Sequence, residues 1–412
     1  MPVIVPFLSG SSKQLSIDVE QPIIYLRGPP SHSTINELKG SIVLNLSKPI
    51  SASLVDVKFV GKAQSQWPEG IGPRGTKLYH EKVIWEQQAV LWQPDVDDKG
   101  MIPAGDHRWP FQFALSNDMV ETIEDEMAQV SYYLSATVRR PGSLVNWKRR
   151  RDMLVLRTLS GDDRMIRMER DTDWCTATIA LEQSAVVAGA HFPLTFMFVP
   201  KQKGVALECI SMVVQEHKAY RLAEYHAARS ENMKFKINLD SATSATDPEM
   251  VDASFAQLRR ALNAKNAHIP LTVEPFQYRL VLQMPDCKSL THSTYFPEIE
   301  IRHLLHIRME LSMPNCTERS IIDFKTPITI MDCRLKDEFG LPAYEERAPS
   351  ANDLDRGEGR FKALSNTLAM GFFVCPCYTE YRKTVMGNRE DFLLLRQQII
   401  SEHTALPPPY DG

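Results

Sequence analysis

The chain has 412 residues, with 47 Lys and Arg against 51 Asp and Glu, a formal charge of −4 and 43% hydrophobic residues. This length suits two ordinary globular domains, and the near-neutral charge argues against a dedicated nucleic-acid-binding protein. No window of about 18 consecutive apolar residues occurs, and the first residues lack the basic and apolar regions of a secretory signal. The seven cysteines are irregularly spaced and odd in number, which argues against a disulfide framework. We therefore expect a soluble, cytoplasmic protein.

Short alternating or apolar runs, separated by turn residues, follow one another from residue 15 to about residue 159. A period of two residues is typical of β-strands. Within residues 54–62, Val55, Val57 and Phe59 share one side of the pleat, so we expect that side to face a core. The runs predict a β-sandwich without a strong helix, and they cover residues 15–19, 23–27, 39–46, 54–63, 82–92, 109–115, 130–139 and 153–159.

A polar stretch at residues 160–164 and the mixed segment 165–174 separate these runs from a second set. The second set predicts strands at residues 176–181, 192–199, 205–215, 271–282, 299–311 and 321–331. We therefore expect an all-β chain of two tandem antiparallel, immunoglobulin-like β-sandwiches. Their predicted bounds are 15–160 and 175–335, and a tail follows at 336–412.

One helix interrupts the second set, within an expected insertion at residues 224–266. Asp247-Pro248-Glu249 provides an N-cap and a proline at the first helical position. Apolar residues at 251, 255, 258 and 262 then form one stripe. We predict a helix over residues 248–263 that lies outside both sheets, with its stripe packed on a sheet or, as the alternative, receiving a partner.

Patterns that would indicate catalysis, a cofactor or a metal ion lack the context that they need. Residues 70–75 match G-x-G-x-x-G, but a strand is expected after them where the phosphate cradle needs a helix. Cys375 and Cys377 lack the second Cys or His pair of a tetrahedral zinc site. His303 and His306 lie three residues apart in an expected strand, so they point to opposite faces. No G-x-S-x-G motif occurs, and we expect no enzyme activity, cofactor or metal.

One run of basic residues stands out in this mildly acidic chain. It surrounds the turn Pro141-Gly142 and contains no acidic residue before Asp152, which predicts a basic hairpin end. Two interpretations remain open: a solvated loop that prevents aggregation, or a surface that attracts anionic lipid headgroups or an acidic or phosphorylated cytoplasmic tail. The candidate residues for membrane or cargo contact are Arg139, Arg140, Lys148, Arg149, Arg150 and Arg151.

Two proline-tyrosine motifs carry the strongest functional signal. Pro407-Pro408-Pro409-Tyr410 has the P-P-x-Y form, in which a preformed polyproline II segment lays its prolines in an aromatic groove while the tyrosine fills a second pocket. Leu341-Pro342-Ala343-Tyr344 has the L-P-x-Y form and follows the last expected strand. A plain proline tail and an edge turn are the alternatives. The candidate binding residues are Leu341, Pro342, Tyr344, Pro407, Pro408 and Tyr410.

Several strand sequences resemble those of a known family, the fungal α-arrestins or arrestin-related trafficking adaptors, over about residues 15–346. Residues 24–28, 38–42, 57–61, 102–113 and 130–138 look like successive strands of an arrestin N-domain. Residues 299–301 and 324–330 look like late strands of an arrestin C-domain. The resemblance implies two sandwiches of the arrestin type and no catalytic centre.

The resemblance also implies a partner and a role. In this family, P-P-x-Y and L-P-x-Y motifs bind the WW domains of HECT-type ubiquitin ligases, which implies that role for the six motif residues. The expected function is to bring the ligase to plasma-membrane transporters or receptors and so promote their ubiquitination and endocytosis. The protein would then associate peripherally with plasma membrane and endosomes. The alternative is an endosomal sorting scaffold of the retromer type that acts without a ligase, and WW-domain binding separates the two.

Overall fold

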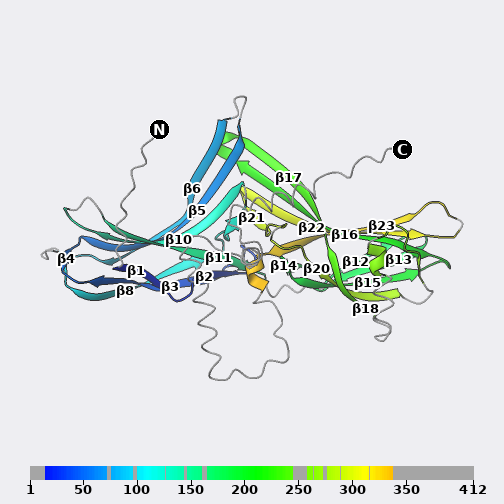
Figure 1. Cartoon of the computed structure of the whole chain (residues 1–412), viewed down its shortest axis with the longest axis horizontal. Helices are drawn as coiled ribbons and strands as arrows, with labels where there is room; N and C mark the ends of the chain where they lie inside the picture. Colours follow the sequence, from blue (N-terminus) through cyan, green and yellow to red (C-terminus); the bar gives the residue numbers. More distant parts are fainter. Residues whose placement is uncertain are drawn as a thin grey trace, which may run out of the picture. The chain divides into compact units, whose positions relative to one another are not determined.

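The computed structural model describes residues 14–71, 76–95, 100–125, 127–142, 146–159, 165–244, 258–262, 264–271, 276–287, 289–314 and 316–336. These residues fall into two compact units, one ending at Leu156 and the next beginning at Arg157. Both units consist almost entirely of β-strands, as Figure 1 shows. The predicted all-β fold class is therefore confirmed.

The first unit has two main sheets. The three-stranded sheet has the order β1 (Leu15–Val19), β3 (Ile35–Leu46), β8 (Gly105–Ser116). The six-stranded sheet has the order β2 (Ile23–Arg27), β11 (Trp147–Thr158), β10 (Ala128–Arg139), β5 (Leu54–Ile71), β6 (Thr76–Trp92), and β9 (Ile123–Glu124) pairs with β10. The short strands β4 (Ile50–Ser51) and β7 (Met101–Ile102) form a separate pair. The pairs of β1 with β3, β3 with β8, β5 with β6, β5 with β10, β9 with β10 and β10 with β11 are antiparallel.

The core of the first unit lies between these two sheets. Val55, Val57 and Phe59 of β5 are fully buried, which confirms that this side of the pleat faces a core. The ring of Phe59 stacks on Phe113 of β8 at 6.5 Å and on Tyr132 of β10 at 5.7 Å. Because Phe113 belongs to the opposite sheet, these contacts join the two layers of a β-sandwich.

The strands β5 and β6 are longer than the sequence pattern indicated. They form a hairpin that projects beyond the rest of the first unit in Figure 1. No residue of β6 from 79 to 92 is fully buried. On β5, the buried side continues beyond Ala63 with Ser65 and Trp67, so a polar residue interrupts the apolar alternation and the sequence pattern revealed only the inner part of the hairpin.

The second unit is also a sandwich of two sheets. The five-stranded sheet has the order β12 (Ile166–Asp171), β13 (Cys175–Leu181), β15 (His191–Pro200), β20 (Phe276–Gln283), β18 (Asn238–Ser244). The seven-stranded sheet has the order β14 (Ala185–Val187), β23 (Ser320–Met331), β22 (Ile299–Ser312), β16 (Ala206–Leu222), β17 (Ala227–Lys236), with β19 (Ile269–Pro270) on β16 and β21 (Thr294–Phe296) on β22. The pair of β14 and β23 is parallel, which is an exception to the expected antiparallel arrangement. Two 3-10 turns lie at Ala223–Tyr225 and Cys333–Leu335.

Besides the short strands β14, β19 and β21, three longer strands of the second unit occupy segments where no strand was expected. β12 lies in the segment 165–174, which was expected to be a connection, and β17 and β18 lie inside the expected insertion at 224–266. All three are edge strands of their sheets. An edge strand has one neighbour and needs few apolar residues, so β12 and most of β17 carry exposed charged side chains and show no apolar run.

The predicted helix at 248–263 is described only in part. Residues 258–262 are helical and belong to no strand, and Leu258 and Ala261 are buried. The proposed N-cap at Asp247 and the stripe residues at 251 and 255 lie outside the described residues. Burial of Leu258 is what a stripe packed against the protein requires.

Candidate functional site

Both proline-tyrosine motifs lie outside the described residues, which end at residue 336. The six motif residues, Leu341, Pro342, Tyr344, Pro407, Pro408 and Tyr410, therefore have no structural description, and their WW-domain role stays a prediction. Cys375 and Cys377 also lie outside the described residues. What the structure does describe is the basic hairpin, a groove in the first unit and a buried polar cluster in the second.

The six basic residues lie on the hairpin of β10 and β11, which we name the basic hairpin. Gly142 takes a φ of 73° at its turn, a conformation that glycine tolerates. Residues 148–151 were expected at a hairpin end, and they lie within β11, where they pair with residues 134–137 of β10. Strand pairing continues almost to the turn, to Trp147 opposite Val138.

Strand alternation sends the four basic residues of β11 to two faces. Arg149 and Arg151 lie opposite Ala136 and Leu134 of β10, both fully buried, so they share the face that covers the core. Lys148 and Arg150 lie on the other face. Residues that are consecutive in the sequence thus do not form one continuous charged surface.

Arg151 is held within the first sandwich. It is half-buried and donates a hydrogen bond of 2.8 Å to the carbonyl of Ile17 in β1, so it joins the two sheets. Burial lowers the pKa of the Arg151 guanidinium, and Asp18 opposes that shift. This side chain therefore stabilises the contact between the two sheets, and its part in membrane or cargo contact stays a prediction.

Two other arginines of the basic hairpin also have partners. Arg150 lies over the ring of Tyr133 at 3.9 Å and donates to Asp152 at 2.8 Å. Arg139 lies 4.0 Å from the buried carboxylate of Asp56. Each carboxylate offsets part of the positive charge that the sequence places here.

The exposed charge of the basic hairpin is concentrated on a few residues near its tip. Arg140 lies over the Trp147 ring at 5.1 Å, and its backbone N–H donates to Asn146. Lys148 and Arg149 are exposed, and neither has a carboxylate partner among the described residues. These two are the best placed of the six to meet an anionic partner.

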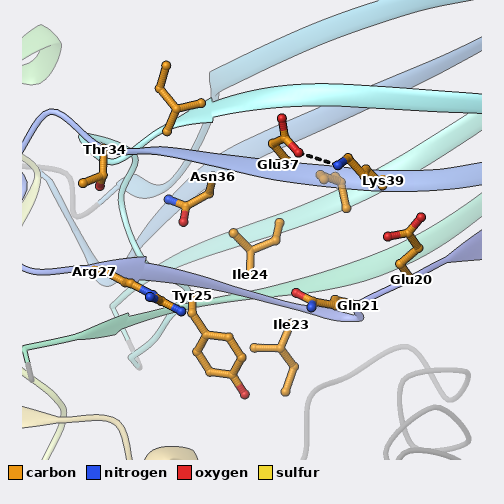
Figure 2. Close-up of a pocket in the computed structure, with 12 residues that line it drawn as sticks. Glu20, Gln21, Ile23, Ile24, Tyr25, Arg27, Thr34, Asn36, Glu37 and Lys39 are labelled. Carbon is orange, nitrogen blue, oxygen red and sulfur yellow. Dashed lines mark ion pairs between the residues drawn. The ribbon is translucent and has the colours of Figure 1, made fainter.

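A groove of about 620 Å³ opens between β2 and the first half of β3, which we name the β2–β3 groove (Figure 2). Ile24 and Leu38 give it an apolar floor and are nearly fully buried. Glu37 and Lys39 form an ion pair of 2.5 Å at its upper side, and this hydrogen bond raises the pKa of Lys39. No residue pattern reveals this groove, because its lining comes from two strands in different sheets.

The second unit contains a buried polar cluster, which we name the Glu216 cluster. It consists of Glu216 and Lys218 on β16, His303 on β22, and Thr291 and Ser293 in the segment before β21. Glu216 accepts hydrogen bonds from the Thr291 N–H at 2.8 Å and from His303 Nε2 at 3.1 Å. Lys218 Nζ lies 3.5 Å from Glu216 and donates to Thr291 Oγ1 at 3.0 Å.

The Glu216 cluster fixes the segment that precedes β21. Ser293 Oγ lies 2.8 Å from His303 Nδ1 and accepts the Ile330 N–H at 2.9 Å. Burial by itself would raise the pKa of Glu216, but Lys218 and His303 oppose it and the pKa lies below its ordinary value. Glu216 is therefore an ionised carboxylate in the interior of the second sandwich.

The two histidines of β22 point to opposite faces, as their spacing predicted. His303 is buried in the Glu216 cluster, whereas His306 lies on the other face beside Asp323 at 2.8 Å. Among the described residues, no group of three or more His, Cys, Asp or Glu side chains is arranged to hold a metal ion. In the same part of the chain, no helix is long and apolar enough to span a bilayer.

Two domain models match the chain in tandem. The arrestin (or S-antigen) N-terminal domain matches residues 17–161, and the arrestin (or S-antigen) C-terminal domain matches residues 172–335. The first match falls on the first sandwich and the second on the second sandwich. The resemblance drawn from the strand sequences is thereby confirmed.

Several fungal proteins are similar to this chain. A putative arrestin-related trafficking adapter of Schizosaccharomyces pombe is 26% identical over 403 residues, covering 84% of this chain and 58% of that protein. A probable HECT-type ubiquitin ligase-interacting protein of Aspergillus terreus, creD, is 24% identical over 327 residues, covering 74% and 52%. The HECT-type ubiquitin ligase-interacting protein creD of Emericella nidulans is 23% identical, covering 75% and 52%.

The chain spans little more than half the length of these relatives. The similarity nevertheless covers both sandwiches, because the two domain models together reach from residue 17 to residue 335. With an N-terminal and a C-terminal arrestin domain in tandem, the chain belongs to the arrestin family.

Proposed function

We propose that this protein is an adaptor that brings a HECT-type ubiquitin ligase to plasma-membrane transporters or receptors and promotes their ubiquitination and endocytosis. The observation that carries the proposal is the motif Pro407-Pro408-Pro409-Tyr410 in a chain with two arrestin domains. Relatives named as HECT-type ubiquitin ligase-interacting proteins support a ligase partner. The cargo and the WW domain are parts of the proposal that rest on the motifs.

The proposed contact with the ligase uses a preformed peptide conformation. Consecutive prolines favour polyproline II, so residues 407–409 need little ordering before they dock on aromatic rings. Tyr410 then fills a separate pocket as the anchor of the peptide. An L-P-x-Y segment at residues 341–344 provides a second site, and linked sites reinforce each other through a high effective concentration.

The terminal motif is tested with a peptide that spans residues 405–412. Tyr410→Ala removes the anchor, and we expect at least about 2 kcal/mol of lost binding, or roughly thirtyfold in affinity for a HECT-ligase WW domain. Asp411→Ala, which lies just outside the motif, is the matched control and should retain the affinity of the parent peptide. Isothermal titration of the three peptides measures the difference.

In the whole chain, the double variant Tyr344→Ala, Tyr410→Ala should lose ligase recruitment and cargo ubiquitination. Tyr295→Ala is the control, because Tyr295 is an exposed tyrosine outside both motifs. Titration against a fragment of the ligase that carries WW domains in tandem tests this expectation. Parent-level binding by the double variant would reject the ligase adaptor and favour the sorting scaffold of the retromer type.

For the contact with the membrane or cargo, we propose the exposed tip of the basic hairpin, which meets its partner end-on so that Lys148 on one face and Arg149 on the other both approach it. Each basic residue near an anionic surface contributes about 1 kcal/mol, so Lys148→Ala, Arg149→Ala should weaken binding to phosphatidylserine liposomes by about 2 kcal/mol. The control replaces Lys203 and Lys234, two exposed lysines of the second unit, with alanine. Equal liposome binding by both double variants would leave the hairpin as a solvated turn.

A further inference from the structure

We propose that the β2–β3 groove binds a short extended peptide, which adds as a strand to the free half of β3. The peptide has an apolar centre, a basic residue at one end and an acidic residue at the other. This inference does not depend on ligase recruitment, because the described lining of the groove belongs to the first sandwich. The backbone, the floor and the ends of the groove each support it.

The backbone of β3 is open on one side along its first half. β8 pairs with β3 from Ile35 to Leu46, whereas β1 pairs on the other side only from Gly40 to Leu44. The last bond on that side runs from the Glu20 N–H to the Lys39 carbonyl at 3.1 Å. No described strand continues along residues 35–38 on the side of β1.

The free half of β3 presents hydrogen-bonding groups to the groove. Alternate residues of an antiparallel strand direct their N–H and C=O groups to the same neighbour. Because Lys39 bonds toward β1, Glu37 directs its N–H and C=O toward the same open side. Strand addition supplies partners for groups of this kind, and it needs only an extended backbone.

The floor of the groove suits a peptide that places an apolar side chain on it and a backbone carbonyl next to that side chain. Ile24 and Leu38 are 6% and 2% exposed, and both line the groove. Asn36 Nδ2 is buried there and has no hydrogen-bond partner among the described residues. A buried donor without a partner is unfavourable, and the carbonyl of an entering peptide would satisfy it.

The charges of the lining define the ends of the peptide. Figure 2 shows Glu20 at one end of the groove and Arg27 at the other. Neither side chain has an ion-pair partner among the described residues, while Glu37 and Lys39 neutralise each other. The two carboxylates and two cations of the lining give the groove no net charge. This favours a peptide with one basic and one acidic end over a multiply phosphorylated segment, whose negative charges would need an excess of cations.

The dimensions fit a peptide of about five residues. The five residues of β2 span about 17 Å at the rise of an extended strand. The volume of about 620 Å³ lies in the range of ordinary ligand pockets. A longer partner would extend beyond Glu20 or Arg27 into solvent.

The probe is a random heptapeptide library displayed on phage and selected against the whole chain. Selected sequences are synthesised, and hydrogen exchange of the protein is measured with and without them. We expect sequences with an apolar centre and opposite charges at the two ends, and at least tenfold slower exchange of the Glu37 amide, whose N–H faces the open side. Failure to select any such sequence, or selection without slowed exchange in β3, would overturn the proposal.

A charge exchange separates this groove from other peptide-binding surfaces. Glu20→Lys with Arg27→Glu alters two exposed side chains and should leave the fold intact. The parent-selected peptide should bind this variant at least tenfold more weakly, and a peptide with its end charges exchanged should regain the loss. Lys48→Glu, an exposed change beyond the other end of β3, is the control and should alter neither affinity. Unchanged affinities in the double variant would also overturn the proposal.

Discussion

The basic hairpin of the first unit and the Glu216 cluster of the second are both groups of charged residues on neighbouring strands, but they were assembled in opposite ways. The hairpin residues are close in the sequence, and strand alternation divides them between two faces. Glu216 and His303 are 87 positions apart, and strand pairing brings them within 3.1 Å. The fold therefore separates the neighbouring charges of the basic hairpin. In the Glu216 cluster it brings together charged residues that are distant in the sequence.

The two groups also differ in what surrounds their charges. Lys148 and Arg149 are exposed to water, which screens their charges and keeps their cost to folding small. Glu216 and Lys218 are nearly inaccessible, with side-chain exposures of 0% and 4%. A buried pair of this kind is stable only while both partners and their hydrogen bonds are present.

The largest expected effect follows from breaking the Glu216 cluster. Glu216→Gln removes the negative charge and leaves Lys218 as an uncompensated buried cation, so the second sandwich should lose about 3–5 kcal/mol of stability. Hydrogen exchange of the amides of β16 and β22 measures this loss within the second unit. Glu169→Gln, an exposed carboxylate on β12, is the matched control and should change stability by less than about 0.5 kcal/mol.

A second variant separates the charge from the packing. Glu216→Leu with Lys218→Met removes both charges together and should be less destabilising than Glu216→Gln, because no unpaired ion remains. A double variant that is more destabilised than the single one would show that the hydrogen bonds to Thr291, rather than the ion pair, dominate. The same exchange measurement distinguishes the two cases.

Acidification should reduce the contribution of Glu216 in a defined direction. Its folded-state pKa lies below the ordinary value of 4.5, because Lys218 and His303 outweigh the effect of burial. A lowered carboxyl pKa stabilises the fold above the unfolded pKa of about 4.3, and this stabilisation is lost as the pH falls through the folded-state pKa. The stability difference between the parent and Glu216→Gln should therefore shrink as the pH falls below about pH 4. A difference that persists undiminished at pH 3 would contradict the assignment of an ionised Glu216.

The strand pattern predicted most of the fold because burial on one face leaves a period of two in the sequence. Val55, Val57 and Phe59 were placed on the core side for this reason, and all three are fully buried. The same logic failed at β12 and β17, whose edge positions leave many charged residues exposed. A single sequence shows the strands that bury a face better than those that only complete a sheet.

The sites were harder to predict than the strands because they depend on register. The β2–β3 groove needs the position at which β1 stops pairing with β3, and no residue pattern reports that position. Nothing in the sequence distinguished Glu216 and Lys218 as buried, because β16 contains several other polar residues around them. The charges of the basic hairpin were visible, yet only the pairing with β10 shows that Arg151 turns inward.

The smallest expected effects distinguish Arg151 from its neighbour Arg149. Arg151→Met keeps an apolar stem but removes the donor to the Ile17 carbonyl, so the first unit should lose about 1–2 kcal/mol of stability. Arg149→Met changes an exposed side chain on the same strand and should cost less than about 0.5 kcal/mol. Urea denaturation of the two variants, followed by hydrogen exchange in β1 and β11, measures both. Equal losses of stability would mean that the hydrogen bond from Arg151 to Ile17 contributes nothing. The expected larger loss for Arg151→Met would show that Arg151 stabilises the sandwich, whereas the exposed Arg149 does not.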